Sequence, residues 1–379
     1  MNLKTLLETH RISQRKLAEA IGISAASVNN IIKGEWPKSH NKAELMASIN
    51  QFLTKKGISK TDIDTVFNAP NPQPTQEEEA MLLSKQSLTP QAKRQFGLFS
   101  NPFTSDIQSL EELYTSSDIN YVRTAMYHTA KAGGFIAVCA ESGAGKSTLR
   151  RELIERINRE HHAIIVIEPY VLAAEDNDTK GKTLKSLHIA EAILHAIAPL
   201  ERPKISPEAR FRQIHKLLKD SSRAGNQHVL IIEEAHSLPL ATLKHLKRFF
   251  ELEDGFRKLL SIILIGQNEL ALKLSEQNQE VREVVQRCEV VTLEPLSPTG
   301  LTDYLSHRLK PTNKKLSDII DETGVMAITQ RLTATANRKG QHTRSLLYPL
   351  AIGNLLTGAL NSAADLGIPV ITADVVAGV

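Results

Sequence analysis

Apolar residues recur at two different spacings along the chain, and each spacing predicts its own kind of domain. Near the N-terminus, Leu17, Ala20 and Ile21 illustrate a spacing of three to four residues that repeats between residues 3 and 53. Side chains at this spacing share one face of a helix, and neighbouring helices bury such faces against one another. The pattern predicts a compact all-α domain over residues 1–56.

The periodicity weakens between residues 57 and 100. This stretch includes the sequence APNPQPTQEEEA, in which three prolines are followed by three consecutive glutamates. Proline and charge together favour an extended, solvated chain. We therefore expect a linker over residues 57–100.

From Phe135 onward, short β-branched apolar runs alternate with helical stretches. Runs that are apolar on both faces indicate a parallel sheet with helices on both sides. This pattern predicts an α/β domain over residues 101–297, followed by helices over residues 298–379. Cys139 and Cys288 lie in or beside these runs, where we expect buried apolar side chains rather than a disulfide or a metal site. The five predicted strands are residues 135–140, 163–169, 228–236, 260–266 and 289–296.

A loop of small residues, AESGAGKS, follows the first predicted strand and precedes a helix. Small residues let backbone N–H groups surround phosphate oxygens, while Lys146 reaches the β- and γ-phosphates and the Ser147 hydroxyl ligates Mg²⁺. Ala140 occupies the place of the usual first glycine. A glycine-rich turn is the alternative, but the strand-loop-helix context favours ATP binding. The expected ATP contacts are Glu141, Ser142, Gly143, Ala144, Gly145, Lys146, Ser147 and Thr148.

Two adjacent acids, Glu233 and Glu234, end the third predicted strand. We expect Glu233, together with Ser147, to hold the Mg²⁺ shell and Glu234 to orient the attacking water. Aspartate is more common at the position of Glu233. Taken alone, the two acids would suit a solvated loop equally well, but the phosphate-binding loop favours catalysis.

Residues 14–34 contain two helical segments around Gly22, which allows a tight turn, and Ala18, which lets the helices approach. The segment resembles the helix-turn-helix of phage repressors of the Cro/cI kind. The resemblance implies weak sequence preference, because the side chains that would face the bases are short. A three-helix protein-docking domain is the alternative. The implied base contacts are Ser24, Ala25, Ser27 and Asn30, and the implied phosphate contacts are Gln14, Arg15, Lys16 and Lys33.

The positive charge is concentrated at the N-terminus. Residues 1–60 hold ten Lys/Arg and four Asp/Glu, so this segment carries +6 while the whole chain carries +4. A basic domain favours a polyanionic partner such as double-stranded DNA, although a solvated basic face has the same composition. Lys180, Lys182 and Lys185 form a second basic element after the second strand. It suits a DNA-tracking loop and a solvated loop equally well.

Further motifs over residues 100–379 resemble an AAA+ module with a helical lid. They are Gly266-Gln267-Asn268, Gln286-Arg287-Cys288, and the segment 340–344 that opens a late helix. The resemblance implies that Gln267 or Asn268 is sensor 1, that Arg287 acts on a neighbouring subunit's nucleotide, and that Arg344 is sensor 2. Arg282 is the other candidate for the trans-acting arginine. A solvated cation at a helix end is the alternative for each arginine.

The order of helix-turn-helix, acidic linker and AAA+ module resembles the MuB family of target-DNA activators from Mu-like transposing phages, and the related TnsC/TniB transposon ATPases. The resemblance implies subunits that bind ATP and Mg²⁺ and polymerise on duplex DNA as a ring or helical filament. It further implies that they deliver this DNA to a DDE transposase and dissociate on hydrolysis.

Two other functions fit the same motifs: an ATP-dependent helix-turn-helix transcriptional regulator and a helicase loader. Secretion ATPases share similar phosphate-loop segments. They are disfavoured because no apolar run approaches the roughly 20 residues needed to span a bilayer. The N-terminus also lacks the apolar core of a signal peptide. We therefore expect a location in the cytoplasm of a bacterial host cell.

Overall fold

The computed structural model describes residues 12, 14–23, 28, 31, 42–56, 84–169, 185–275, 281–334 and 344–379. The chain divides into two compact units, Met1–Glu79 and Ala80–Val379.

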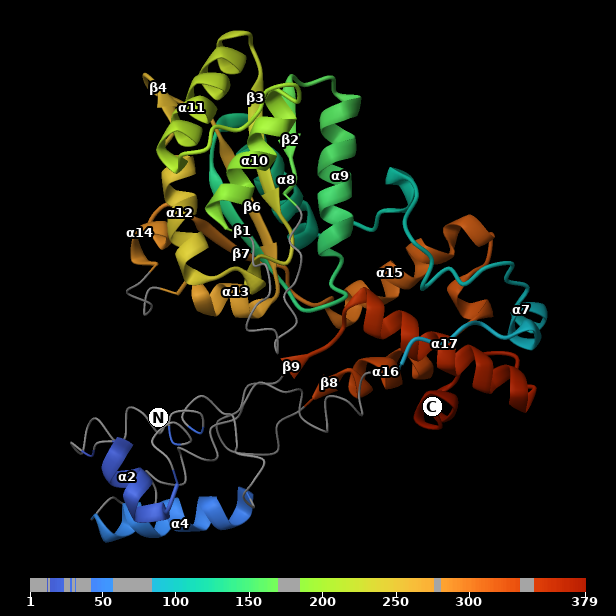
Figure 1. Ribbon diagram of the computed structural model, residues 1–379. Coiled ribbons are helices and arrows are strands. Elements are labelled where there is room, and N and C mark those ends of the chain that lie inside the picture. Colours follow the sequence, from blue (N-terminus) through green and yellow to red (C-terminus); the bar gives the residue numbers. More distant parts are fainter. Residues whose placement is uncertain are drawn as a thin grey trace. The chain divides into compact units, whose positions relative to one another are not determined.

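The first unit is helical in its described part, with α2 (Gln14–Ile21) and α4 (Lys42–Lys55) packed on each other (blue in Figure 1). Gly22 follows α2 with φ +74°, a left-handed conformation that suits glycine. The unit therefore has the predicted small shared core. Its buried members are Leu17, Ala18, Val28, Ile31, Leu45, Ile49 and Leu53.

Five parallel strands form one sheet in the described part of the second unit, in the order β2-β3-β6-β1-β7. Each strand coincides with one of the predicted apolar runs, so the predicted parallel sheet is confirmed. The carboxyl ends of all five strands meet at one edge, which is where the loops after β1, β3 and β6 emerge. The strands are β1 (Phe135–Cys139), β2 (Ile164–Ile167), β3 (Gln227–Ile232), β6 (Ser261–Gly266) and β7 (Glu289–Thr292).

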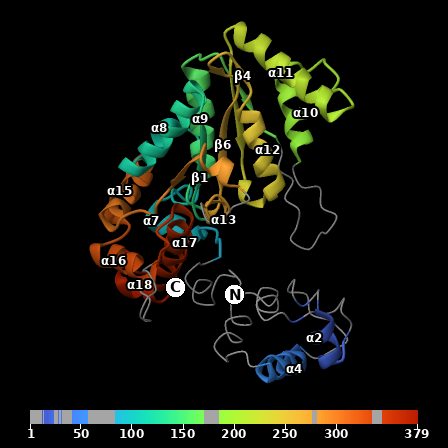
Figure 2. The same cartoon turned by 90° about the vertical axis from the view of Figure 1, so that its left-hand side faces the viewer.

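Helices cover both faces of this sheet. Figure 2 shows α8 and α9 on one side of the strands and α10, α11 and α12 on the other. In β1, Ile136 and Val138 pack towards α8 and α9, whereas Phe135, Ala137 and Cys139 pack into the opposite core. Both faces are therefore apolar. The helices are α8 (Ser117–Ala132), α9 (Lys146–Arg159), α10 (Ser186–Ile197), α11 (Pro207–Arg223), α12 (Leu240–Phe250), α13 (Asn268–Lys273) and α14 (Arg282–Val285).

In a second group of helices, α15, α16 and α18 pack around α17 (Figure 1). These four helices and the short strands β8 and β9 are called the lid below. The predicted late apolar helix is α17, which begins at Pro349 rather than earlier in the apolar run. The elements of the lid are α15 (Pro298–Leu309), α16 (Glu322–Arg331), α17 (Pro349–Leu366), α18 (Ala373–Ala377), and the short strands β8 (Thr333–Ala334) and β9 (Arg344–Ser345).

A further helix, α7 (Pro90–Phe96), packs against α17. The Gln91 side chain donates to the carbonyl of Ala364 at 2.7 Å. The stretch predicted as a linker over residues 57–100 therefore ends in a helix of the second unit.

Candidate nucleotide-binding site

The loop between β1 and α9 adopts two left-handed turns. Gly143 has φ +75° and Gly145 has φ +98°, conformations that residues with a Cβ rarely adopt. Ala140, in the place of the usual first glycine, does not have a positive φ and is fully buried. Its N–H donates to the carbonyl of Gly266 at 3.2 Å. Alanine fits here because neither its backbone conformation nor its surroundings require a glycine.

Lys146, the first residue of α9, is 9% exposed. Its ammonium donates to the carbonyl oxygens of Ala140 at 2.9 Å and Glu141 at 2.8 Å. Burial lowers the pKa of Lys146, and the carboxylates of Glu234 and Glu141 partly oppose this effect. The loop therefore holds a cation beside the N-terminus of a helix, and both features favour a bound phosphate.

The two predicted acids follow β3 at the same edge of the sheet. Glu234 has φ +50°, and its carboxylate lies 3.5 Å from Nδ1 of His236. Glu233 lies 3.1 Å from Nε of Arg150 on α9. Both acids thus emerge beside the phosphate-binding loop, and the charge of Glu234 acts on Lys146.

The polar step after β6 also reaches the phosphate-binding loop. The Asn268 amide donates to the Glu141 carboxylate at 2.8 Å. Gln267 directs its backbone N–H to Nδ1 of His236 at 3.3 Å. Of the two residues that sequence left as alternatives, Asn268 is the one whose side chain bonds the loop in the described structure.

The sequence also predicted two catalytic arginines, Arg287 and Arg344. Arg287 follows α14 and precedes the edge strand β7. Its guanidinium lies 3.2 Å from Glu251 and donates to the carbonyl of Glu283 at 2.9 Å. Among the described residues, none of its bonds is to the phosphate-binding loop. Arg344 does not open a helix as predicted: its backbone lies in β9, paired with Ala334, because the chain stays extended until Pro349.

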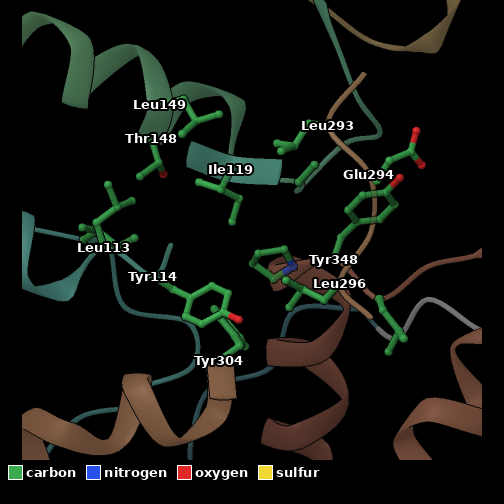
Figure 3. A pocket seen from close by; sticks show the side chains of 15 residues that line it. Leu113, Tyr114, Ile119, Thr148, Leu149, Leu293, Glu294, Leu296, Tyr304 and Tyr348 are labelled. Carbon is green, nitrogen blue, oxygen red and sulfur yellow. The ribbon is translucent and has the colours of Figure 1, made fainter. Parts of the chain in front are cut away.

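Sequence reasoning missed an apolar cavity of about 90 Å³ next to this loop. Figure 3 shows Thr148 and Leu149 of α9, Tyr114 and Tyr348 around it. Its apolar lining and its place beside the loop suit the base of a nucleotide whose phosphates lie on the loop. No local motif marks it, because its lining comes from four segments of the chain; tyrosines in an aromatic-poor sequence were the available signal. The lining is Ile107, Leu113, Tyr114, Ile119, Ala144, Gly145, Thr148, Leu149, Leu293, Glu294, Leu296, Tyr304, Leu347, Tyr348 and Pro349.

Few of the predicted DNA contacts fall on described side chains. Lys16 is exposed on α2, and Lys185 is exposed immediately before α10. Gln14 and Arg15 belong to α2, but their side chains lie outside the described part. The predicted contacts that lie wholly outside it are Ser24, Ala25, Ser27, Asn30, Lys33, Lys180 and Lys182.

The two cysteines are buried and unbonded, as predicted, and burial raises the pKa of Cys139 to about 11. No helix in the described ranges is both long and apolar enough to cross a membrane. The polar groups at the carboxyl edge of the sheet are a lysine ammonium, loop N–H groups, the Ser147 hydroxyl and two carboxylates. This set fits a nucleoside triphosphate with Mg²⁺, which prefers oxygen ligands and usually shares them with phosphates.

Comparison with known proteins agrees with this geometry. A family model described as "AAA domain" matches residues 129–274, and one described as "Cro/C1-type HTH DNA-binding domain" matches residues 2–47. A curated relative, General secretion pathway protein A of Aeromonas hydrophila, is 26% identical over 189 residues, or 48% of this chain. The matched part spans only 31% of that relative's length.

Several solved structures are also similar. Cdc6p from Pyrobaculum aerophilum has 14% identity and a TM-score of 0.47, covering 71% of this chain and 67% of that one. The ORC2 protein of Aeropyrum pernix has 14% identity and a TM-score of 0.45, covering 73% and 70%. RuvB of Thermotoga maritima has 16% identity and a TM-score of 0.40, covering 72% and 70%. By its sheet and the two matching family models, the chain carries an AAA P-loop domain preceded by a helix-turn-helix domain.

Proposed function

We propose that this protein is an ATP-dependent DNA-binding transposition protein that polymerises on target DNA, delivers it to a DDE transposase and is released on ATP hydrolysis. One observation carries the proposal: a phosphate-binding site and a Cro/C1-type domain occur in one chain, in the order that resembles MuB-type ATPases. The strand-transfer chemistry would belong to the transposase.

In this proposal the carboxyl edge of the sheet binds and hydrolyses ATP. Lys146 and the N–H groups of its loop bind the phosphates, and the cavity beside them takes the base. Ser147 and Glu233 hold Mg²⁺, which when bound neutralises charge on the β- and γ-phosphate oxygens. Glu234 orients the attacking water, and Asn268 contributes a polar contact from the adjacent loop.

The proposal also assigns a trans-acting role to Arg287. Its partners Glu251 and Glu283 hold it on the surface next to the edge strand, and its side chain is 36% exposed. An arginine placed there can reach the nucleotide of a second copy of this chain. Hydrolysis would then require neighbouring subunits, which supports assembly into a ring or filament.

A role in secretion is a second candidate, favoured by the similarity to General secretion pathway protein A. The two candidates differ in what the N-terminal unit binds. The matching Cro/C1-type model and the charge of +6 in residues 1–60 both favour DNA.

Electron microscopy with ATP and duplex DNA of random sequence tests the proposal. We expect continuous protein coats on the DNA that require ATP and disappear after hydrolysis. Nuclease footprinting should show long protected stretches. Protection of a single palindromic site would instead indicate a transcriptional regulator, and no DNA binding at all would leave secretion as the better candidate.

A further inference from the structure

Arg150 joins three elements at the edge of the sheet that carries the phosphate-binding loop. It lies in α9, four residues after Lys146, and therefore on the same face of the helix one turn further along. Its Nε lies 3.1 Å from the Glu233 carboxylate after β3, and its Nη1 donates to the Glu168 carboxylate after β2. The Arg150 side chain is only 23% exposed. Arg150 is therefore held by a charge-assisted hydrogen bond to Glu168 and by a close ion pair, without hydrogen-bond geometry at Nε, to Glu233.

Glu233 by itself does not hold its carboxylate in one place. A glutamate has one more rotatable bond than the aspartate that is common at this position, so its carboxylate can occupy more places. The Arg150 guanidinium lies 3.1 Å from Oε2 of Glu233, and this ion pair favours carboxylate positions beside α9. Partners of this kind orient the groups that bind a metal.

Glu168 balances the charge of this cluster. Arg150 with Glu233 alone would be neutral and would attract a cation weakly. With Glu168 included, two carboxylates and one guanidinium carry a formal charge of −1. The cluster can therefore fix Glu233 and still attract a divalent cation.

We propose that Arg150 is a positioning residue for the divalent cation that accompanies the nucleotide: it holds the Glu233 carboxylate in place and Glu168 keeps the cluster negative. This inference rests on the ATPase function proposed above. It assigns a role to an ion-pair cluster that no motif of the sequence identifies.

Binding of a fluorescent ATP analogue, titrated with Mg²⁺ and repeated in EDTA, tests this role without relying on turnover. In Arg150→Ala we expect the Mg²⁺ concentration for half-maximal binding to rise about tenfold or more, the usual cost of losing such a partner. Binding in EDTA should stay within about twofold, because the phosphate contacts of Lys146 are untouched. Arg150→Lys keeps the charge but loses the planar geometry. Its Mg²⁺ concentration for half-maximal binding should therefore lie between those of the unaltered protein and Arg150→Ala.

Arg151→Ala is the matched control, since Arg151 is the next residue of α9, is exposed, and makes no ion pair within the described part of the chain. Its Mg²⁺ requirement should equal that of the unaltered protein. Glu168→Gln keeps both Arg150 and Glu233 and removes the net negative charge, so it should raise the Mg²⁺ requirement by a smaller factor than Arg150→Ala.

Two outcomes distinguish a failure of the role of Arg150 from a failure of the proposed ATPase function. An unchanged or lower Mg²⁺ requirement in Arg150→Ala, with nucleotide binding intact, overturns the role of Arg150 alone. Failure of the unaltered protein to bind the analogue under any condition overturns the proposed function and this inference together. If Arg150→Ala does not fold, as judged by circular dichroism, Arg150→Lys and Glu168→Gln decide the question.

Discussion

The backbone N–H of Leu350 donates to the carbonyl oxygen of Gly143 at 3.3 Å. This hydrogen bond joins the first turn of the lid helix α17 to the phosphate-binding loop. A Cβ added to Gly143 would lie 2.3 Å from the Cβ of Leu350, far closer than such atoms can approach. The loop and the lid are thus in direct contact, and a shift of either one would disturb this contact.

We predict that Gly143→Ala destabilises the second unit more than Gly145→Ala. Both glycines have positive φ, so both variants carry strain of about 1–2 kcal/mol. Only Gly143 also faces Leu350, whereas a Cβ at Gly145 would meet nothing within 4 Å. Urea unfolding without nucleotide gives both free energies of unfolding.

The clash can be tested by removing the opposing atom. Adding Leu350→Gly to Gly143→Ala should cost less than the sum of the single changes, because the two Cβ atoms no longer collide. Additive effects, or equal destabilisation by the two alanine variants, would show that the contact with the lid is unimportant.

We expect Glu234→Gln to bind ATP and fail to hydrolyse it. Glutamine keeps the size of the side chain but loses the charge that orients the attacking water. Complexes with DNA should then persist in ATP, as measured by dissociation rates. Glu233→Gln is the comparison and should weaken Mg²⁺-dependent binding instead. Normal turnover by Glu234→Gln would transfer the water-orienting role to another group.

Arg287→Ala should bind ATP nearly normally and lose hydrolysis by a factor on the order of 10³, the low end for an arginine supplied in trans. Arg282→Ala, a change to the other candidate at the first residue of α14, should retain activity. Steady-state ATPase assays over a range of protein concentrations measure both. Full activity of the unaltered protein at concentrations where it is monomeric would contradict a shared site.

Mixing two inactive variants tests the same interface directly. Arg287→Ala retains an intact loop and Lys146→Ala retains an intact arginine, so mixed neighbours should recover part of the activity. Co-assembly on DNA without any recovery would make Arg287 a structural cation that only stabilises its contacts with Glu251 and Glu283.

Deletion of residues 1–56 should weaken DNA binding and flatten its dependence on salt. Each lost phosphate contact lowers the slope of log affinity against log salt concentration by about one. Fluorescence anisotropy with labelled duplex DNA at several salt concentrations gives this slope. Some ATP-dependent binding should survive through the AAA domain. Complete loss of DNA binding, with nucleotide binding intact, favours the regulator over the transposition protein.

The sheet could be predicted because its central strands are apolar on both faces and are bounded by helical stretches, whereas the edge strand β7 buries only Val291. Strands such as Ser261–Gly266 are too short to be confused with core helices. The start of α17 could not be predicted in the same way. Leu346 and Leu347 are buried in the lid core while the chain is still extended, and periodicity does not separate that state from a helix. Pro349, which suits the first turn of a helix, was the better signal.

The short helix α7 had local signals that the proline-rich stretch before it obscured. Thr89 caps the helix by accepting from the N–H of Ala92, Pro90 occupies the first turn, and Gly97 ends it with φ +63°. Its seven residues depend on contacts with α17, which no local pattern reveals. The apolar cavity beside the phosphate-binding loop was missed for the same reason, since only the folded chain brings its four segments together.

Glu234 has a backbone conformation that glycine or asparagine would adopt more readily, at a cost of about 1–2 kcal/mol for glutamate. Under the role proposed for its carboxylate, the chain gives up thermal stability to keep that group in place. Selection of this protein for heat tolerance alone would therefore favour replacing Glu234 by glycine or asparagine. The selected variants would be more stable proteins that still bind nucleotide. Under the proposed role of Glu234 they would no longer hydrolyse ATP and would therefore stay bound to DNA.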